Sequence, residues 1–203
     1  VQVDVDSGEL KIIADGFTVP AAVNFDSKGI LHVVDNETGE IFQIDISSGE
    51  KTLIATAPSN LDNLTFDNND NLYITNMSDN AIYWVDRVNG AVELIVGGSL
   101  STPAGIDVFG ETLYIADTFS LSKADIKTGI VSDISRIISD HEYPVAVSVT
   151  EKTVVMVKDT RTYNIDSTNA TAPIDILDIF VRETVNNTTT DLPLNRMSRA
   201  EYS

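Results

Sequence analysis

Oxygen-bearing side chains recur along this sequence at a nearly constant interval of 41 residues. One column consists of Asp35, Asn76, Asp117 and Asp159, and a second of Asn24, Thr65, Asp107 and Ser148. Such oxygens, gathered around one point, can bind a cation or the hydroxyl groups of a sugar-like ligand. Asp and Asn also accept hydrogen bonds from their own backbone in tight turns. The sequence favours this turn role for the first column and leaves the binding role open.

The two histidines are the other candidates for chemistry. His141 lies in the stretch DHEYP, just before a proline that leads an expected strand. It could act as a general base, and a solvated loop histidine is the alternative that the sequence favours. His32 falls in the middle of an expected strand, where the next copy of the pattern has Tyr73, which indicates packing. Because the sequence has no cysteine, it excludes thiolate catalysis, disulfides and cysteine-based metal sites.

The charge balance limits the partners. With 13 Lys and Arg against 31 Asp and Glu, the formal net charge is −18. Such a surface repels nucleic acid, and no apolar run is long enough to span a membrane. Six Asn-x-Ser/Thr triplets incline the expectation towards an exported protein, secreted, periplasmic or on the cell surface, and a cytoplasmic location is left open.

One sequence pattern is repeated along most of the chain. Its copies are ILHVVDNETGEIFQID at 30–45, NLYITNMSDNAIYWVD at 71–86, TLYIADTFSLSKAD at 112–125 and TVVMVKDTRTYNID at 153–166. A partial copy opens the chain, because QVDVDSGE at 2–9 matches QIDISSGE at 43–50. Each full copy is preceded by a short apolar run and followed by a glycine turn and another run. Each unit therefore predicts four short strands, with no helical period.

Four strands in about 41 residues are typical of one blade of a β-propeller. We expect an all-β propeller of four-stranded antiparallel blades, with about four and a half blades present. Within the second strand of each unit, Leu31, Val33, Leu72, Ile74, Leu113 and Ile115 should face one neighbouring blade, and Val34, Tyr73 and Tyr114 the other.

The expected organisation is residues 1–166 as blades, the first of them partial, and residues 167–203 as the outer strand of the last blade plus an irregular tail. The blades are expected to form part of a six-bladed propeller, with further blades of the same chain as neighbours. A closed five-bladed ring that uses the tail is the alternative.

The stretch STPAGIDVFGETLYIADT at 101–118 resembles the NHL-repeat and senescence-marker-protein/gluconolactonase group of six-bladed propellers. The stretch LYITNMSDNAIYWVD is also similar to the YVTN-type repeats of surface-layer propellers. The resemblance covers roughly residues 1–166. For the lactonase branch it implies one divalent cation, usually calcium, on the central axis, with ligands at the starts of several inner strands.

Carried over by position, the ligand places implied by this resemblance are Ala21, Asp62, Ala104 and Val145. Only Asp62, followed by Asn63, offers a side-chain oxygen, whereas calcium takes six to eight oxygens. We therefore expect a non-catalytic module that binds a small molecule or a protein at the propeller axis. Its candidate ligand-binding residues are Asp62, Asn63, Asp107, Asp35, Asn76 and Asp117, with Asp62 also the candidate metal ligand.

Two enzyme functions remain as alternatives. One is a calcium-dependent gluconolactonase-like hydrolase whose site is completed by blades absent from this segment. The other is a lyase of the streptogramin type, which this fold also resembles, although no matching pair of catalytic histidines is found.

Overall fold

The structure is a computed structural model of the 203-residue chain. It describes residues 1–118, 120–136, 142–150, 153–162, 174–185 and 188–198. All the regular elements in this part of the chain are strands. None of the described residues belongs to a helix long and apolar enough to cross a bilayer.

The strands form one two-stranded sheet and four four-stranded antiparallel sheets, each with its strands in chain order. The half-blade is β1 (Gln2–Val3) and β2 (Leu10–Lys11). Blade 1 is β3 (Pro20–Phe25), β4 (Leu31–Asp35), β5 (Glu40–Ile44) and β6 (Lys51–Thr56). Blade 2 is β7 (Leu61–Phe66), β8 (Leu72–Asn76), β9 (Ala81–Val85) and β10 (Val92–Gly97).

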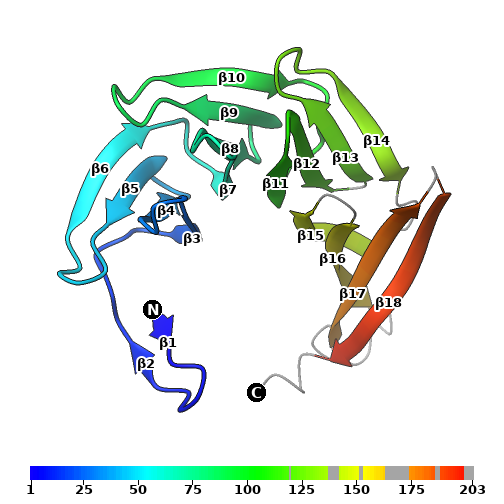
Figure 1. Ribbon diagram of the computed structural model, residues 1–203, viewed down its shortest axis with the longest axis horizontal. Helices are drawn as coiled ribbons and strands as arrows, with labels where there is room; N and C mark the ends of the chain where they lie inside the picture. The colour runs from blue at the N-terminus through cyan, green and yellow to red at the C-terminus, as the bar shows by residue number, and fades with distance from the viewer. Residues whose placement is uncertain (119, 137–141, 151–152, 163–173, 186–187, 199–203) are drawn as a thin grey trace, which may run out of the picture.

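The other two blades follow the same order. Blade 3 is β11 (Ile106–Phe109), β12 (Thr112–Asp117), β13 (Ser120–Asp125) and β14 (Val131–Arg136). Blade 4 is β15 (Glu142–Val149), β16 (Thr153–Thr162), β17 (Ile174–Val185) and β18 (Thr188–Ser198). In Figure 1 the sheets stand side by side in an arc, with β3, β7, β11 and β15 innermost. The predicted all-β fold of four-stranded propeller blades is confirmed, and the number of six blades stays a prediction.

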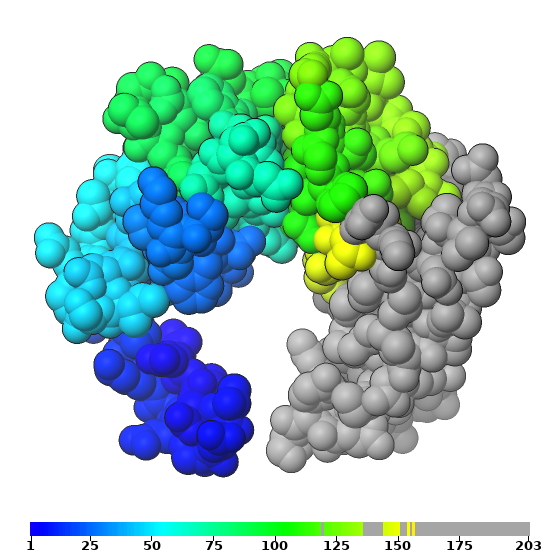
Figure 2. Space-filling view, in the orientation of Figure 1, coloured from blue at the N-terminus to red at the C-terminus, as the bar shows by residue number. Residues whose placement is uncertain are grey.

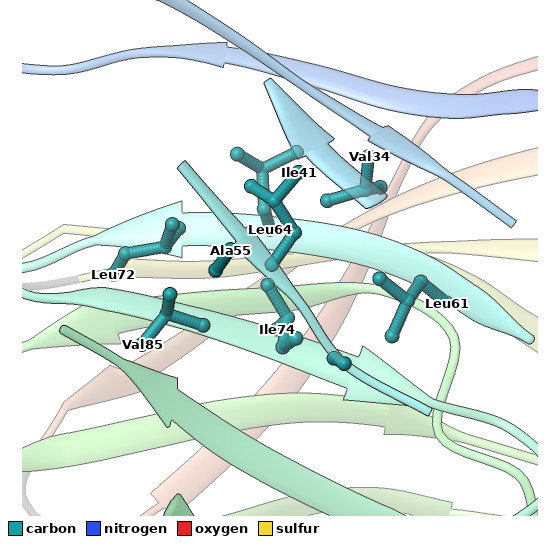
Figure 3. Close-up of a cluster of buried hydrophobic side chains, with 9 residues drawn as sticks. Val34, Ile41, Ala55, Leu61, Leu64, Leu72, Ile74 and Val85 are labelled. Atoms are coloured by element: carbon teal, nitrogen blue, oxygen red, sulfur yellow. The ribbon is translucent and has the colours of Figure 1, made fainter. Parts of the chain in front are cut away.

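The hydrophobic core lies between the blades. One cluster joins Val34, Ile41, Ala55 and Ala57 of blade 1 to Leu61, Leu64, Leu72, Ile74 and Val85 of blade 2 (Figure 3). A second cluster joins Tyr73, Ile82, Val96 and Leu100 of blade 2 to Ile106, Leu113, Ile115 and Ala124 of blade 3. Because a thin sheet cannot shield both of its faces, each blade depends on its neighbours for burial.

The second strand of blade 2 shows how alternation serves this arrangement. Successive side chains of a strand point to opposite faces. Leu72 and Ile74 pack in the cluster shared with blade 1, and Tyr73 between them packs in the cluster shared with blade 3. Both faces are buried, and this assignment agrees with the pattern expected from the sequence.

The recurring glycines sit in the turns between the third and fourth strands. Gly49 and Gly90 adopt φ angles of +76° and +75°, which favour glycine. A Cβ on Gly49 would lie only 2.5 Å from a backbone carbonyl oxygen of the preceding connection, and one on Gly90 would lie 3.0 Å from such an oxygen of the preceding blade. The carbonyls approached by Gly49, Gly90 and Gly129 belong to Ile13, Ile54 and Ile95. Each glycine turn therefore packs on the preceding repeat.

The last blade differs from the expected layout. The sequence predicted the outer strand within residues 172–185 and an irregular tail after it. In the structure, β17 is the third strand and pairs with β16, from Thr153 opposite Glu183 to Thr162 opposite Ile174. β18 is the outer strand. The domain boundary at residue 166 stays a prediction.

Candidate functional site

The inner strand begins and the second strand ends at the same edge of a blade. In blade 1 Pro20 pairs with Asp35, and in blade 2 Leu61 pairs with Asn76. We call this edge of the blades the axial face. At this edge the first polar column, which includes Asp35, Asn76 and Asp117, lies beside the starts of the innermost strands (Figure 1).

Asp35 is buried, and its carboxylate accepts four backbone N–H bonds. Oδ2 accepts from Thr18 at 2.6 Å and from Val19 at 3.2 Å, and Oδ1 accepts from Glu37 at 3.2 Å and from Thr38 at 3.3 Å. Burial by itself raises the pKa of this carboxyl, but the N–H groups outweigh it and hold the pKa below its ordinary value. The side chain ties the connection before β3 to the turn after β4.

Asn76 and Asp117 occupy the corresponding positions in the next two blades, and both side chains are buried. Each also bonds to the connection before the inner strand of its blade. The Asn76 Nδ2 group donates to the Ser59 carbonyl at 2.8 Å. The Asp117 carboxylate accepts from the N–H groups of Ser101 at 2.9 Å and Thr102 at 2.7 Å. These bonds reach backbone of the connection before the inner strand, 15 to 17 positions earlier, and not the residue's own turn. Ligand binding by the first column stays a prediction.

The second polar column links the inner strands to one another. Nδ2 of Asn24 donates to the Leu64 carbonyl at 3.3 Å. The Thr65 hydroxyl donates to Oδ1 of Asp107 at 3.2 Å, and the Val149 N–H donates to Oδ2 of Asp107 at 2.7 Å. Hydrogen bonds thus connect blade 1 to blade 2, blade 2 to blade 3, and blade 3 to blade 4. Asp107 is a tie between blades in the structure, and a ligand-binding role for it stays a prediction.

Asp62 differs from every other predicted residue. It lies in an irregularity of the ladder at the start of β7, where the pairing shifts between Leu61 and Leu64. Its side chain is half-buried, and no hydrogen bond or ion pair joins its carboxylate to the described residues. Burial raises the pKa of Asp62 above its ordinary value. This carboxylate therefore lies at the axial face without a compensating donor among the described residues.

Asn63 lies next to Asp62 and is partly engaged. Its N–H donates to the Thr75 hydroxyl at 2.9 Å, and that hydroxyl donates to the Ala104 carbonyl of blade 3 at 2.9 Å. Its Oδ1 accepts the N–H of Leu64 at 2.9 Å. Asp62 and Asn63 therefore lie side by side at the axial face, while Asp35, Asn76, Asp117 and Asp107 are engaged with backbone or with side chains of neighbouring blades.

The described residues do not fit an axial calcium ion. Among them, no three His, Asp or Glu side chains gather closely enough to hold a metal. Of the implied ligand places, Ala21 and Ala104 have no side-chain oxygen, and the Ala104 carbonyl accepts the Thr75 hydroxyl. His141, the candidate general base, lies outside the described residues.

The sequence did not reveal a polar cluster at the other edge, between blades 1 and 2. Arg87 forms an ion pair with the buried Asp26, with an N–O distance of 2.8 Å. The same Arg87 nitrogen lies 3.2 Å from Nε2 of His32, which is fully buried. The Phe66 ring lies 4.8 Å from the imidazole and 5.1 Å from the guanidinium carbon. The mid-strand position of His32 was the only signal of this cluster.

His32 should make stability fall in mild acid. Burial lowers its pKa, Arg87 lowers it further, and the hydrogen bond to the Ile30 carbonyl opposes both. The folded chain therefore keeps a neutral imidazole, while the unfolded chain takes up a proton near its ordinary pKa of 6.5. We expect the free energy of unfolding to decrease as the pH falls below 6.5, because the unfolded state then binds more protons.

Urea unfolding between pH 7.5 and 5 checks this expectation. His32→Gln should remove the decrease, since its amide does not titrate in this range. The matched control is His141→Gln, which should retain it. A decrease of equal size in the His32→Gln variant would show that other groups cause it.

Comparison with known proteins places the fold. No protein-family model matches the sequence, and no curated protein matches it significantly. A gluconolactonase from Xanthomonas campestris superposes with a TM-score of 0.67 at 12% identity, over 92% of this chain and 64% of that one. A virginiamycin B lyase from Staphylococcus aureus gives 0.59 at 14% identity, over 86% and 70%. A chain of a nidogen–laminin complex gives 0.62 at 10% identity, over 90% and 81%.

At such identities the likeness shows the fold alone. It confirms the predicted resemblance at that level, that of the β-propeller fold. The superposed proteins include enzymes and a binding partner, so function must be argued from the residues of this chain.

Proposed function

We propose that this chain is a non-catalytic propeller module that binds a polar ligand at the axial face through Asp62. The observation that carries this proposal is the carboxylate of Asp62, which makes no hydrogen bond or ion pair with the residues that the structure describes. A half-buried charge without a hydrogen bond destabilises the fold. A ligand that supplied the missing donors would relieve this penalty.

The hydrogen bonds made by the other oxygen-bearing side chains at the axial face support binding over catalysis. Asp35 and Asp117 direct their carboxylate oxygens at backbone N–H groups, and the amide of Asn76 is bound on both sides by backbone. These groups hold the loops in place. Asp62, with the amide of Asn63 beside it, remains as the group that can meet a ligand.

The chemistry of the ligand follows from these two residues. A carboxylate and an amide recognise an ammonium group or a set of hydroxyl groups. The net charge of −18 also favours the approach of cations. The proposed partners are an amine-bearing or hydroxyl-rich small molecule, or a basic segment of a protein ligand, together with further blades of the same repeat. An exported location suits such a binding module.

Asp62→Asn separates binding from folding. We expect the variant to unfold at a higher temperature at pH 7, because it removes a charge that burial disfavours. Since the pKa of Asp62 is raised, the gain should appear as the pH rises above the ordinary aspartate pKa of 3.8 and vanish below it. Calorimetry at pH 3 and at pH 7 measures the unfolding temperatures of the variant and the natural chain. The variant should unfold at a higher temperature at pH 7 and at the same temperature at pH 3.

Binding is tested by thermal shift and titration with glucosamine, spermidine and a lysine-rich peptide as probes. At least one probe should raise the unfolding temperature of the natural chain, and Asp62→Asn should abolish the rise. Glu93→Gln, which removes one exposed charge from β10, is the matched control and should retain it. If a probe raised the unfolding temperature equally in both variants, the effect would come from general charge attraction. That outcome would refute the proposal.

A calcium-dependent lactonase-like hydrolase is the second candidate. It is favoured by the position of Asp62, which is where the resemblance implies a metal ligand. The described residues alone do not fit calcium, so this function would need ligands from elsewhere. Stoichiometric calcium binding together with turnover of a lactone panel would replace the binding module with this enzyme.

A further inference from the structure

The face of blade 1 that points away from blade 2 is apolar and open among the described residues. Val23 and Phe25 of β3 are 63% and 53% exposed. The counterparts of Val23 are Leu64 in blade 2, which is 1% exposed, and Ile106 in blade 3, which is 4% exposed. Phe66, the counterpart of Phe25 in blade 2, is partly buried. The later residues are covered because a complete blade precedes them. Blade 1 has only the half-blade in that place.

The half-blade and blade 1 enclose an apolar groove. A cavity of about 390 Å³ lies between them, with walls that include Val1, Phe17, Val23, Leu31 and Val33. Figure 2 shows the N-terminal residues, in dark blue, set against blade 1 at one end of the arc. The second and third strands of blade 1 are already shielded there, because Val33 of β4 and Ile44 of β5 are 4% and 3% exposed. The uncovered part is the inner strand.

A free strand edge borders the same groove. β1 pairs with β2 through Gln2 opposite Lys11 and Val3 opposite Leu10. No described strand pairs with the other edge of β1. The sequence match of 2–9 to 43–50 makes β1 the counterpart of β5, whose other edge is occupied by β4. The half-blade therefore corresponds to the third and fourth strands of a blade, and the groove lies where the first and second strands would stand.

We propose that this groove binds an inner strand pair of the same 41-residue repeat. The occupant is a two-stranded antiparallel hairpin that hydrogen-bonds to the edge of β1 and covers Val23 and Phe25 with apolar side chains. Blade 2 shows the required chemistry, because Tyr73 of its second strand lies in the same buried cluster as Ile106 of blade 3. The inference rests on exposure and register and is independent of any ligand at the axial face.

The chain contains the segment needed to test this proposal. Val1 corresponds to Tyr83 by the 41-residue interval, taken twice. Residues 57–82, joined directly before Val1, therefore place a copy of β7 and β8 in register with β1. The matched control is the same fusion with Tyr73→Asp and Ile82→Asp in the added segment only.

Thiol labelling gives a local readout, because the sequence has no cysteine. Val23→Cys in the unextended chain should react quickly, and Leu64→Cys provides the buried reference. In the fusion, the Val23→Cys thiol should react at least about tenfold more slowly, since labelling then requires the added pair to open. Amide exchange at Gln2 and Val3 should slow in parallel. The control fusion should react as quickly as the unextended chain.

Two results would overturn the proposal. One is an unchanged labelling rate in a fusion that is folded by circular dichroism. The other is protection of the Val23→Cys thiol in the unextended chain that increases with protein concentration and coincides with a dimer in sedimentation. That result would identify a second copy of the chain as the occupant.

Discussion

Replacing Leu64 by alanine is expected to lower the free energy of unfolding by about 2–5 kcal/mol. Leu64 is 1% exposed and lies in the cluster between blades 1 and 2, so the change leaves a cavity that two rigid sheets cannot close. Urea unfolding followed by circular dichroism measures the loss. The dependence on urea should keep its slope if the folded and unfolded states are otherwise unchanged.

Val23→Ala is the matched control, because Val23 occupies the same position of the repeat in blade 1. Its side chain is 63% exposed, so we expect a loss below about 0.5 kcal/mol. Leu64→Val should fall between the two. Equal losses for Leu64→Ala and Val23→Ala would mean that burial between blades does not stabilise this chain.

Replacing Asp35 by alanine is the second large effect, with an expected loss of about 2–4 kcal/mol at pH 7. The change leaves the N–H groups of Thr18 and Val19 without the carboxylate that now accepts them. Because the pKa of Asp35 is lowered in the folded chain, its contribution is present above the ordinary value of 3.8 and is lost as the pH falls further. The difference between natural chain and variant should shrink accordingly in acid.

Asp45→Ala is the control for this prediction. Asp45 also accepts turn N–H groups, from Ser47 at 2.8 Å and Ser48 at 3.2 Å, but it is exposed to solvent. Water can replace it there, so the loss should stay below about 1 kcal/mol. A loss at Asp35 no larger than at Asp45 would contradict the inferred role of burial.

The blade architecture could be predicted from the sequence because packing between blades imposes a local pattern. Alternation along Leu72, Tyr73 and Ile74 is sufficient to assign the two faces of β8, and the 41-residue interval transfers that assignment to other blades. The glycine column was equally visible, although its contact with the preceding repeat was not.

Partners across blades could not be predicted in the same way. Arg87 and His32 are 55 positions apart, and nothing in the interval indicates which turn of one blade meets which strand of the next. The same holds for Asp35, whose partners are backbone N–H groups without a residue preference. The fourth blade was misassigned for a different reason. Its outer strand is polar and rich in threonine, a composition that β-strands and loops share.

The turns at Gly49, Gly90 and Gly129 pack on the repeat before them, and the two apolar clusters each join adjacent blades. Folding energy among the described blades is therefore distributed as a row of couplings between adjacent sheets, and Asp107 makes two of them, to the blade before its own and to the blade after it. Such an array of sheets should unfold progressively, beginning at the end where the coupling between adjacent sheets is weakest. Blade 1, with one face uncovered, should exchange its amides earlier than blade 2, and a defect at a central seam should divide the molecule into two independently melting stretches.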